Sequence, residues 1–396
     1  MSQYLLLNRV RVQNANAVSG FTWGFPAITH FLGFTHNLHR KLKQHPRFND
    51  FSLQGCAVIA HEHQVHCYRT SGGINFSQNK SAHYLELKFD KGRLKDPSVI
   101  EEAKMNMTVS LLIGFDGYVG NQEDAFKQWI TNISSIQRLA GGTVLDIDAV
   151  ELLDLSEESS LRRLKRKLLP GFILQDRSED LAVYFEEELQ KQNPDAELID
   201  AWLNFSALKQ KARPKSDLIE KHLRKRWKEN PNSEEVEQLL TCWQDHKAEP
   251  YDLGNIPSLL TTYFASLSLD EKEHHKLHAQ WQAYCEPTDK TDSDWEYVKK
   301  PIQGYLVPIM TGYKAISQVY EKGSVAGARD SETDVCFVES VHSIGEWQSI
   351  HRIKTTEVLA NSLWYYAPYE THWYLCKQGI ERHKTEDTTR TPSIYD

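Results

Sequence analysis

The stretch QNANAVSGFTWGFPAITHFLGFTHNLHRKL (13–42) decides more about the fold than any other part of the chain. Amide side chains end an expected strand, aromatic side chains fill the turn after it, and a helix begins at Pro26, where the missing N–H of proline is tolerated. The amides and aromatics are Gln13, Asn14, Asn16, Phe21, Trp23 and Phe25. Amides read base edges, rings stack on unpaired bases, and a helix N-terminus attracts phosphate. The segment predicts a ligand-binding β–turn–α unit, and nucleic acid is one of several ligands that fit it.

Working outward, the periodicity of apolar residues predicts strand–helix–strand followed by strand–helix–strand. The expected strands are 4–12, 54–69, 105–115 and 143–154, and the expected helices are 27–42 and 122–138. Gly141 and Gly142 read as the cap at the end of the second helix, because glycine is the usual residue there. This order is typical of a ferredoxin-like, RNA-recognition-type domain of the α+β class.

The chain changes character after about residue 178, where a helix-rich segment is broken by prolines and closed by the polar linker 286–294. We expect an inserted α-helical domain there, and short strands again from 302 to 375. The expected domain limits are 1–194 and 296–376 for the two parts of the RNA-binding domain, 195–295 for the helical insert, and 377–396 for a polar tail.

Composition limits the class of protein. The 396 residues are 40% hydrophobic, which is ample for a core, and no apolar run is long enough to span a bilayer. The N-terminus lacks the basic and apolar regions of a signal peptide. Six cysteines without a CxxC pair indicate reduced thiols, so we expect a cytoplasmic protein with no membrane partner. The net charge of −8 is not typical of a nucleic-acid-binding protein, so any such binding would depend on basic groups that are clustered.

Two amphipathic helices are expected to carry such clusters. In 161–168, leucines hold one face and the cations Arg162, Arg163 and Arg166 the other. In 217–228, the cations Lys221, Arg224, Lys225 and Lys228 share a face, which we call the cationic stripe. No acid is interspersed in the stripe, so the repulsion between its cations is uncompensated. A phosphate backbone bound there would relieve this repulsion. A solvated face is the other interpretation of both helices.

The segment before the second basic helix also holds cations and an amide. KQKARPK (209–215) reads as a flexible approach to that helix, and its cations, with Asn204 upstream, are candidates to reach bases. These candidates are Asn204, Lys209, Lys211, Arg213 and Lys215. Arg226 falls toward the apolar side, where we expect a buried partner.

The sequence gives little support for a metal site or for a catalytic nucleophile. His61 and His63 share one strand face while His66 lies on the other, so the three do not converge, and His274 with His278 lacks a third ligand. We expect no metal and no cofactor. The sequence contains no GxSxG motif and no Walker loop. A metal-independent ribonuclease built on His36 or His351 with Lys41 is the enzymatic alternative.

Longer blocks carry a resemblance to a known family. Besides 13–42 they are RLAGG (138–142), LRRLKRKLLPGFIL (161–174), GYLVPIMTGYKAIS (304–317), ARDSET (328–333), FVESVHSIGEWQSIHRI (337–353) and LWYY (363–366). With these blocks the chain resembles the Csy-type, Cas-five-class subunit of subtype I-F CRISPR surveillance complexes. The resemblance covers about 1–190 and 300–370, whereas about 200–295 falls outside the usual family pattern.

The resemblance implies a non-catalytic RAMP protein that caps the 5′ handle of a crRNA and has a protruding thumb hairpin, placed here near 70–105. It implies crRNA, backbone (Cas-seven-type) subunits and a recruited helicase-nuclease as partners. The matched residues that would bind RNA are Gln13, Asn14, Asn16, Trp23, His36, Arg40, Arg138, Arg162, Arg163, Arg166, Arg329, Trp347, His351 and Arg352.

The helical insert favours a minimal variant of the complex that has no separate large subunit. In that interpretation the insert reads the protospacer-adjacent motif on target double-stranded DNA. The cationic stripe and residues 204–215 would make the contacts. The alternative is a standard handle-capping subunit that works beside a separate large subunit.

Overall fold

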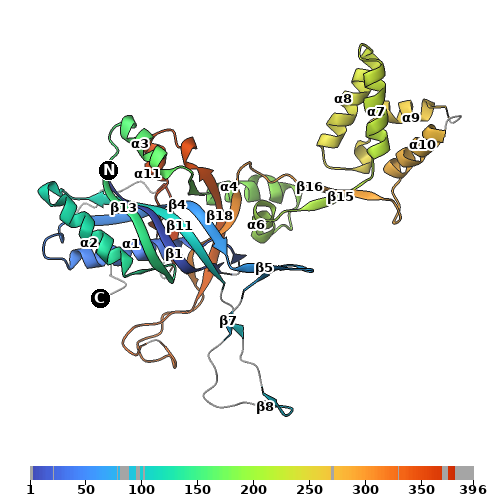
Figure 1. Ribbon diagram of the computed structural model, residues 1–396. Helices are drawn as coiled ribbons and strands as arrows, with labels where there is room; N and C mark the ends of the chain where they lie inside the picture. The colour runs from blue at the N-terminus through green and yellow to red at the C-terminus, as the bar shows by residue number, and fades with distance from the viewer. Residues whose placement is uncertain are drawn as a thin grey trace. The chain divides into compact units, whose positions relative to one another are not determined.

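The computed structural model describes residues 3–20, 22–77, 79–80, 89–94, 99–100, 103–268, 272–328, 330–367 and 373–379. The chain divides into two compact units (Figure 1). The first, which we call the sheet unit, joins Met1–Ser206 with Ile302–Asp396. The second, the helical unit, comprises Ala207–Pro301.

Four antiparallel strands and two helices form the centre of the sheet unit. They are β1 (Gln3–Asn16), α1 (Ile28–Lys43), β4 (Ser52–Val65), β11 (Lys104–Asp116), α2 (Glu123–Ser135, after the 3-10 turn Gly120–Gln122) and β13 (Gly142–Asp154). In the sheet they lie in the order β13-β1-β11-β4. The two predicted strand–helix–strand segments are therefore present, with boundaries within a few residues of those expected.

Side-chain alternation in β1 explains how the sheet is covered on both faces. Leu5 and Leu7 belong to the larger core, which also holds Phe31 of α1 and Phe126 of α2. Tyr4 and Leu6 point to the other face and join a second core with the leucines of α3 (Glu158–Leu168). The 3-10 turn η4 (Ile350–Arg352) and α11 (Thr356–Asn361) complete that second core.

The sheet continues beyond β4 and curls. The full order among the described residues is β12-β13-β1-β11-β4-β14-β18-β17-β20-β19. A two-way backbone bridge between Cys56 of β4 and Trp364 brings the end of this order back to β4. The added strands are β12 (Arg138–Leu139), β14 (Phe172–Asp176), β17 (Leu306–Ala315), β18 (Val338–Ser349), β19 (Tyr365–Tyr366) and β20 (Tyr374–Lys377).

The glycines at 141 and 142 have a different role from the one expected. Helix α2 ends at Ser135, and β12 then pairs with β13 as a hairpin, Leu139 opposite Gly142. Ala140 and Gly141 form its two-residue loop with φ of 51° and 73°, the positive values that this tight turn needs. The predicted helix cap is therefore wrong. These glycines belong to a hairpin, and the local sequence does not show the strand pairing that forms it.

A third, smaller core extends the sheet unit past the expected boundary at residue 194. It joins α4 (Ser178–Val183), the π-helical turn Tyr184–Leu189, α5 (Gln190–Gln192) and α6 (Leu198–Ser206) to β17 and β18. Trp202 of α6 is buried and its indole N–H donates to the Ser343 carbonyl over 3.0 Å. Residues 195–206, assigned to the insert from sequence, thus pack in the sheet unit.

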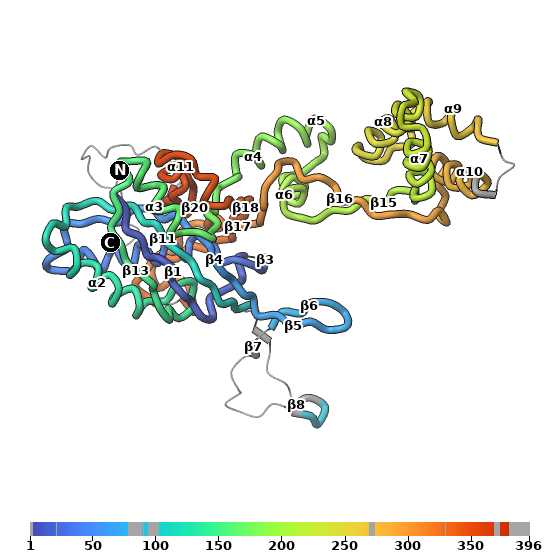
Figure 2. Tube along the Cα trace, turned by 45° about the horizontal axis from the view of Figure 1, so that its top comes forward, coloured from blue at the N-terminus to red at the C-terminus, as the bar shows by residue number. Residues whose placement is uncertain are grey.

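The thumb expected near 70–105 is described in part. After β4 the chain forms the hairpin β5 (Cys67–Thr70) and β6 (Gly73–Phe76), which projects beyond the end of the sheet in Figures 1 and 2. Further on, β7 (Asn79–Lys80) pairs with β10 (Val99–Ile100), and β8 (Phe89–Asp90) pairs with β9 (Arg93–Leu94). Residues 78, 81–88, 95–98 and 101–102 of the expected thumb lie outside the described residues.

The helical unit consists of a two-stranded ribbon and helices with their own core. The ribbon pairs β15 (Gln210–Pro214) with β16 (Ser293–Tyr297). The helices are α7 (Asp217–Glu229), α8 (Glu234–Ala248), α9 (Ser258–Ser266, after the 3-10 turn Leu253–Asn255) and α10 (Lys272–Cys285). Their buried residues include Leu223, Trp243, Phe264 and Trp281. Residues 209–215, expected to be a flexible approach, are largely this strand.

Candidate nucleic-acid interfaces

The turn after β1 is held together by its own amide side chain. The Asn16 side chain accepts a hydrogen bond from the Val18 amide at 3.0 Å and donates to the Val18 carbonyl at 3.1 Å. The Asn16 backbone amide donates to the carbonyl of Ala140, which ties this turn to the β12–β13 hairpin. The Asn16 side chain is therefore engaged within the turn, in the way that Asn commonly stabilises turns.

Gln13 and Asn14 differ from Asn16 because both are exposed. A register shift between Val12 and Ala15 in the pairing with β11, and a φ of 57° at Asn14, mark an irregularity that redirects side chains at this strand end. Gln13 lies in a cavity of about 340 Å³ across strands β1, β4, β11 and β13. Its lining is Arg11, Val12, Gln13, Glu62, His63, Gln64, Asn106, Met107, Thr108 and Leu145.

Arg138 lies next to Gln13 across one strand. In the sheet Thr143 of β13 is opposite both Arg138 and Gln13. The Arg138 guanidinium donates to the Thr143 hydroxyl at 3.1 Å and is otherwise exposed. The structure thus brings together side chains that are about 125 positions apart in the chain, and we call Gln13, Asn14, Asn16, Trp23 and Arg138 the sheet-end surface.

Aromatic rings extend this surface toward the projecting hairpin. Strands β2 (Val18–Ser19) and β3 (Thr22–Trp23) form the turn, and the Trp23 ring lies 4.1 Å from the Phe76 ring of β6, centroid to centroid. Phe76 is 43% exposed and is not among the residues predicted from the sequence. Its one signal there is that it is an aromatic residue within a polar hairpin. Phe21, one of the expected aromatic residues, lies outside the described residues.

Trp347 is a packing residue at this point of the fold. Its ring meets the Phe25 ring edge to face at 4.8 Å, and both rings pack against the larger core. Trp347 is half-buried, so its contribution to RNA binding would be through support of the turn. Arg329, predicted in the same block, lies outside the described residues.

The predicted RNA-binding residues at 162–166 and 351–352 form a second surface, which carries several arginines. Ile350 and Ile353 pack against the leucines of α3, which places η4 beside that helix. Lys165 donates to the Ile353 carbonyl at 2.7 Å and fastens the two elements. The exposed groups are Arg162, Arg163, Arg166, His351 and Arg352, which we call the α3–η4 surface.

His36 and Arg40 form a separate pair on the exposed side of α1. Partial burial of the ring, and secondly the charge of Arg40, lower the pKa of His36. The imidazole is therefore neutral near pH 7, and Arg40 is the cation of this pair.

Two of the histidines considered as metal ligands, His61 and His274, have structural partners. His61 lies 2.8 Å from the Pro170 carbonyl and 2.7 Å from the Ser110 hydroxyl, and burial lowers the pKa of its ring. In the helical unit, His274 lies 2.8 Å from the Ser268 carbonyl. Among the described residues no group of three or more His, Cys, Asp or Glu side chains is arranged to hold a metal ion.

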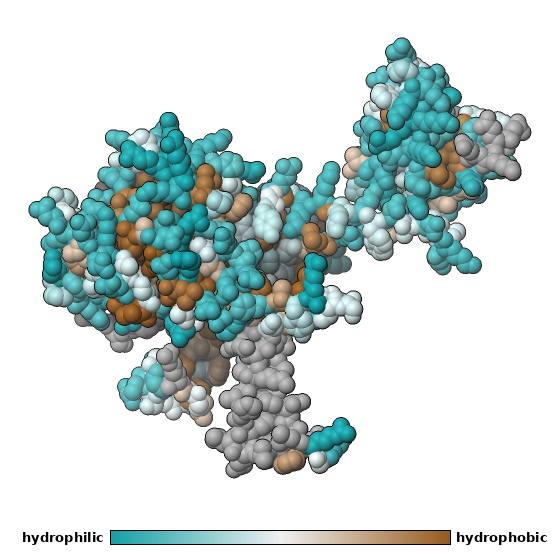
Figure 3. All heavy atoms as spheres, viewed as in Figure 1, coloured by the Kyte–Doolittle hydropathy of each residue, from teal (hydrophilic) through white to brown (hydrophobic). Residues whose placement is uncertain are grey.

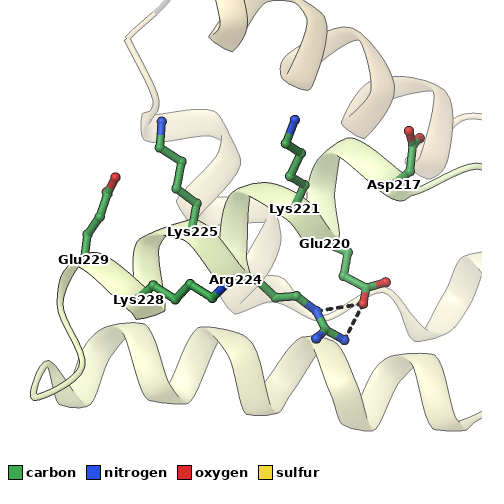
Figure 4. A pocket seen from close by; sticks show the side chains of 7 residues that line it. All are labelled: Asp217, Glu220, Lys221, Arg224, Lys225, Lys228 and Glu229. Atoms are coloured by element: carbon green, nitrogen blue, oxygen red, sulfur yellow. Dashed lines mark hydrogen bonds and ion pairs between the residues drawn. The ribbon is translucent and has the colours of Figure 1, made fainter.

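The cationic stripe lies along α7 and lines an open cleft of about 710 Å³ (Figure 4). The expectation that it contains no acid is wrong, since Glu220 pairs with Arg224 at 2.6 Å, one turn apart. Figure 4 shows Lys221, Lys225 and Lys228 along the same cleft, and none of the three forms an ion pair with a described residue of the chain. In the view of Figure 3 the surface over α7 and α8 is largely hydrophilic.

Arg213 cannot reach a ligand from where the structure places it. Its side chain is 1% exposed and forms an ion pair with Glu296 at 2.9 Å. It also donates to the Tyr284 hydroxyl and to the carbonyls of His246, Lys247 and Glu249. The expectation of DNA contact by Arg213 is therefore corrected: this guanidinium fastens the ribbon to the helices. Lys209, Lys211 and Lys215 of the same segment are exposed.

Two other predicted side chains also have internal partners. Asn204 belongs to α6 of the sheet unit, and its amide donates to the Tyr184 hydroxyl at 3.0 Å. Arg226 lies near Tyr263, which is half-buried; burial, the larger cause, raises the pKa of that phenol, and the charge of Arg226 lowers it. Arg226 itself is exposed, so its expected buried partner is a partly buried hydroxyl.

Comparison with known proteins gives a consistent result. A family model described as "CRISPR-associated protein (Cas_Csy2)" matches residues 5–238 and 251–376. The protein "CRISPR-associated protein Csy2" of Pseudomonas aeruginosa (strain UCBPP-PA14) is 29% identical over 380 residues, covering 91% of this chain and 90% of that protein. The matched ranges leave out residues 239–250 of the helical unit, and the expectation that about 200–295 falls outside the usual family pattern stays a prediction.

Proposed function

Since the chain belongs to the Csy2 family of CRISPR-associated proteins, we propose that it is the subunit of a type I-F CRISPR complex that holds the crRNA 5′ handle and contacts target DNA. The family relationship supports membership of the complex. The two nucleic-acid contacts rest on the surfaces described above. The sheet unit would hold RNA and the helical unit would hold DNA, without a catalytic step in either.

We assign the centre of the sheet unit to the ferredoxin-like class. Its support is the strand order β13-β1-β11-β4, in which the fourth, first, third and second strands of the motif are neighbours. Helices α1 and α2 pack into the same core on one face of these strands. This is the arrangement that RNA-recognition-type domains use.

Handle binding rests on the sheet-end surface. Gln13 and Asn14 present amides, Arg138 presents a guanidinium beside them, and Trp23 adds a ring at the turn. Unpaired RNA is read by this combination of base-edge hydrogen bonds and stacking. The arginines of the α3–η4 surface and Arg40 would serve phosphates, as cations commonly do, and His36 beside Arg40 would contribute a neutral ring.

Target DNA binding rests on one observation, the three lysines of the stripe that face an open cleft on α7 (Figure 4). A helix that presents cations along one side suits the phosphate backbone of a duplex. The proposed contacts are Lys209, Lys211, Lys215, Lys221, Arg224, Lys225 and Lys228. Arg213 and Asn204 are left out because both side chains are engaged within the protein.

Protein partners would bind at other places. The β5–β6 hairpin exposes Tyr68, Ile74 and Phe76, and such apolar side chains on a projecting hairpin suit contact with a backbone (Cas-seven-type) subunit. Among the described residues, no helix has both the length and the apolar character needed to cross a bilayer. A recruited helicase-nuclease and a cytoplasmic location follow from the proposed role.

The test is target binding by the assembled complex at fixed salt. Lys221→Gln with Lys225→Gln should weaken binding of target duplex, while guide RNA content and assembly stay normal. The matched control is Lys276→Gln with Lys290→Gln, two exposed lysines of the same unit. Equal duplex affinity of both variants would remove the helical unit from DNA binding and favour the alternative, a handle-capping subunit beside a separate large subunit.

A further inference from the structure

The ribbon β15–β16 carries two large aromatic rings that the fold leaves uncovered. Trp295 is 65% exposed and Tyr297 is 68% exposed, although both lie in a paired strand. Neither side chain forms a hydrogen bond or ring contact with another described residue. Figure 1 shows the ribbon with the helices α7–α10 gathered at one of its ends. Two neighbouring exposed rings form a contiguous apolar patch, a feature that marks binding sites, and Trp and Tyr are enriched at interfaces.

The orientation of these rings is fixed by the residue between them. Side chains alternate along a strand, so Glu296 points to the face opposite Trp295 and Tyr297. On that inner face Glu296 is held by Arg213 at 2.9 Å and by Lys247 at 3.0 Å. Arg213 in turn is bound to Tyr284 of α10. These ion pairs, one of them to the buried Arg213, therefore hold the outer face, with its two rings, away from the helices.

The outer face has the shape of a stacking platform. Trp295 lies opposite Ala212, whose small side chain leaves the indole face open, and Tyr297 lies opposite Gln210, an amide that can reach a base edge. Rings two residues apart on a strand are separated by about 6.6 Å, a distance that an extended single strand spans between neighbouring bases. RNA-recognition sheets use aromatic residues on strands in the same manner.

Charge favours nucleic acid over protein as the occupant. Lys215 and Lys299 are exposed just beyond the ends of β15 and β16, whereas Lys211, opposite Glu296, belongs to the inner face. Of the acids in β16, Glu296 is neutralised by its two cations, and Asp294 lies opposite Arg213 on the inner side. Cations at both ends of an aromatic pair are the composition of sites that bind single strands with little sequence preference.

We propose that the outer face of the β15–β16 ribbon binds an unpaired nucleic-acid strand by stacking bases on Trp295 and Tyr297. This extends the proposed function and rests on it: a helical unit that holds a target duplex through α7 meets an unpaired strand where that duplex opens. The stripe and the ribbon then serve the two forms of one target, paired and unpaired.

The test uses the assembled complex and a labelled oligothymidylate that has no complementarity to the guide. Trp295→Ala with Tyr297→Ala should weaken binding of this single strand by about 5- to 100-fold for each ring, the range of base stacking on aromatic side chains. The matched control is Tyr305→Ala, which removes a ring that is 69% exposed in the sheet unit. Trp295→Phe with Tyr297→Phe, which keeps the rings, should retain most of the affinity.

A second readout does not depend on the alanine variant folding. Stacking of thymine should quench the fluorescence of Trp295, so the quench on adding oligothymidylate should be smaller in Trp295→Phe than in the unchanged protein. Three results would overturn the proposal. The first two are equal quenching in Trp295→Phe and the unchanged protein, and equal affinity of the double alanine variant and the Tyr305→Ala control. The third is a double alanine variant that loses a backbone subunit from the complex but keeps its affinity for the single strand. Duplex binding by the complex with Lys221→Gln and Lys225→Gln is measured in parallel. If that duplex affinity does not fall, the result counts against DNA binding by the cationic stripe and not against single-strand binding by the ribbon.

Discussion

The sheet unit and the helical unit present similar basic helices, α3 and α7, on different supports. In α3 three cations have partners inside the unit: Lys165 donates to the Ile353 carbonyl, Lys167 pairs with Glu151, and Arg162 pairs with Glu158 at 3.5 Å. In α7 one cation of the stripe, Arg224, is paired, while three lysines face an open cleft. Two helices with the same sequence pattern thus differ in how many of their charges remain for a ligand. This number depends on the residues that surround each helix in the folded protein.

The supports differ in kind as well. Helix α3 rests on the sheet through Leu161, Leu164 and Leu168, all part of an apolar core. The helical unit is tied to its ribbon by the buried Arg213, which makes contacts to three carbonyls, a hydroxyl and a carboxylate. A unit that depends on a buried charge is more sensitive to loss of one partner than a unit that depends on apolar area alone.

The largest expected effect follows from this difference. Arg213→Ala should lower the free energy of unfolding of the helical unit by about 3–5 kcal/mol, since it leaves Glu296 without its closest buried partner. Denaturant unfolding followed by tryptophan fluorescence should show this unit melting early while the sheet unit melts as before. Lys211→Ala is the control, because that neighbouring side chain is exposed. Unchanged unfolding in the Arg213 variant would show that the ion pair does not hold the unit.

The α3–η4 surface gives the next effect. Changing Arg162, Arg163 and Arg166 to Gln should reduce the salt slope of guide RNA affinity by about 2, as three phosphate contacts to a single strand predict. The apolar side of α3 is untouched, so circular dichroism and unfolding should remain normal. A slope equal to that of the unchanged protein would assign these arginines to a protein partner or to solvent.

Gln13 and Asn16 should separate ligand binding from turn stability. Gln13→Ala removes an exposed amide and should weaken binding to handle RNA by about 1–3 kcal/mol, the range of a lost base contact, while a scrambled strand binds as before. Asn16→Ala removes two hydrogen bonds within the turn and should lower stability by about 1–2 kcal/mol and weaken both RNAs alike. If Asn16→Ala discriminates between the two RNAs, the Asn16 side chain reads sequence after all.

The smallest effect is expected at Glu220. Glu220→Gln should free Arg224 and raise duplex affinity slightly, since an exposed i,i+4 pair is worth only about 0.3–0.5 kcal/mol. The effect should shrink further at high salt because exposed charges are screened. Weaker duplex binding by this variant would mean that Glu220 positions Arg224 for its contact.

Much of the fold was predictable because local patterns decide it. The strands near 4–12, 105–115 and 143–154 and the helices at 27–42 and 217–228 have apolar periodicities that match their burial. The family blocks were also visible as written, and the family relationship is confirmed by the comparisons.

The missed features depend on partners far away in the chain. Arg213 reads as one more cation of a basic run, yet Glu296, which buries it, lies 83 residues further on. Helix α6 was assigned to the insert because its sequence is helical, but Trp202 finds its acceptor at Ser343, 141 residues away. Strand β15 (QKARP) has Ala212 as its one hydrophobic residue, so no apolar alternation marks it as a strand or signals its pairing with β16. Long-range pairing of this kind is not encoded in any window of sequence.

The salt dependence of target-duplex affinity in the assembled complex tests the central claim most directly, with the two basic helices varied in turn. Changing Lys221, Lys225 and Lys228 to Gln should reduce the slope of log affinity against log salt by about 2.7, the release of three counterions from duplex DNA. The Arg162, Arg163 and Arg166 variant, loaded with guide RNA to the same extent, should leave that slope unchanged. An unchanged slope in the α7 variant, or an equal reduction in both variants, would contradict the assignment of DNA to the helical unit and RNA to the sheet unit.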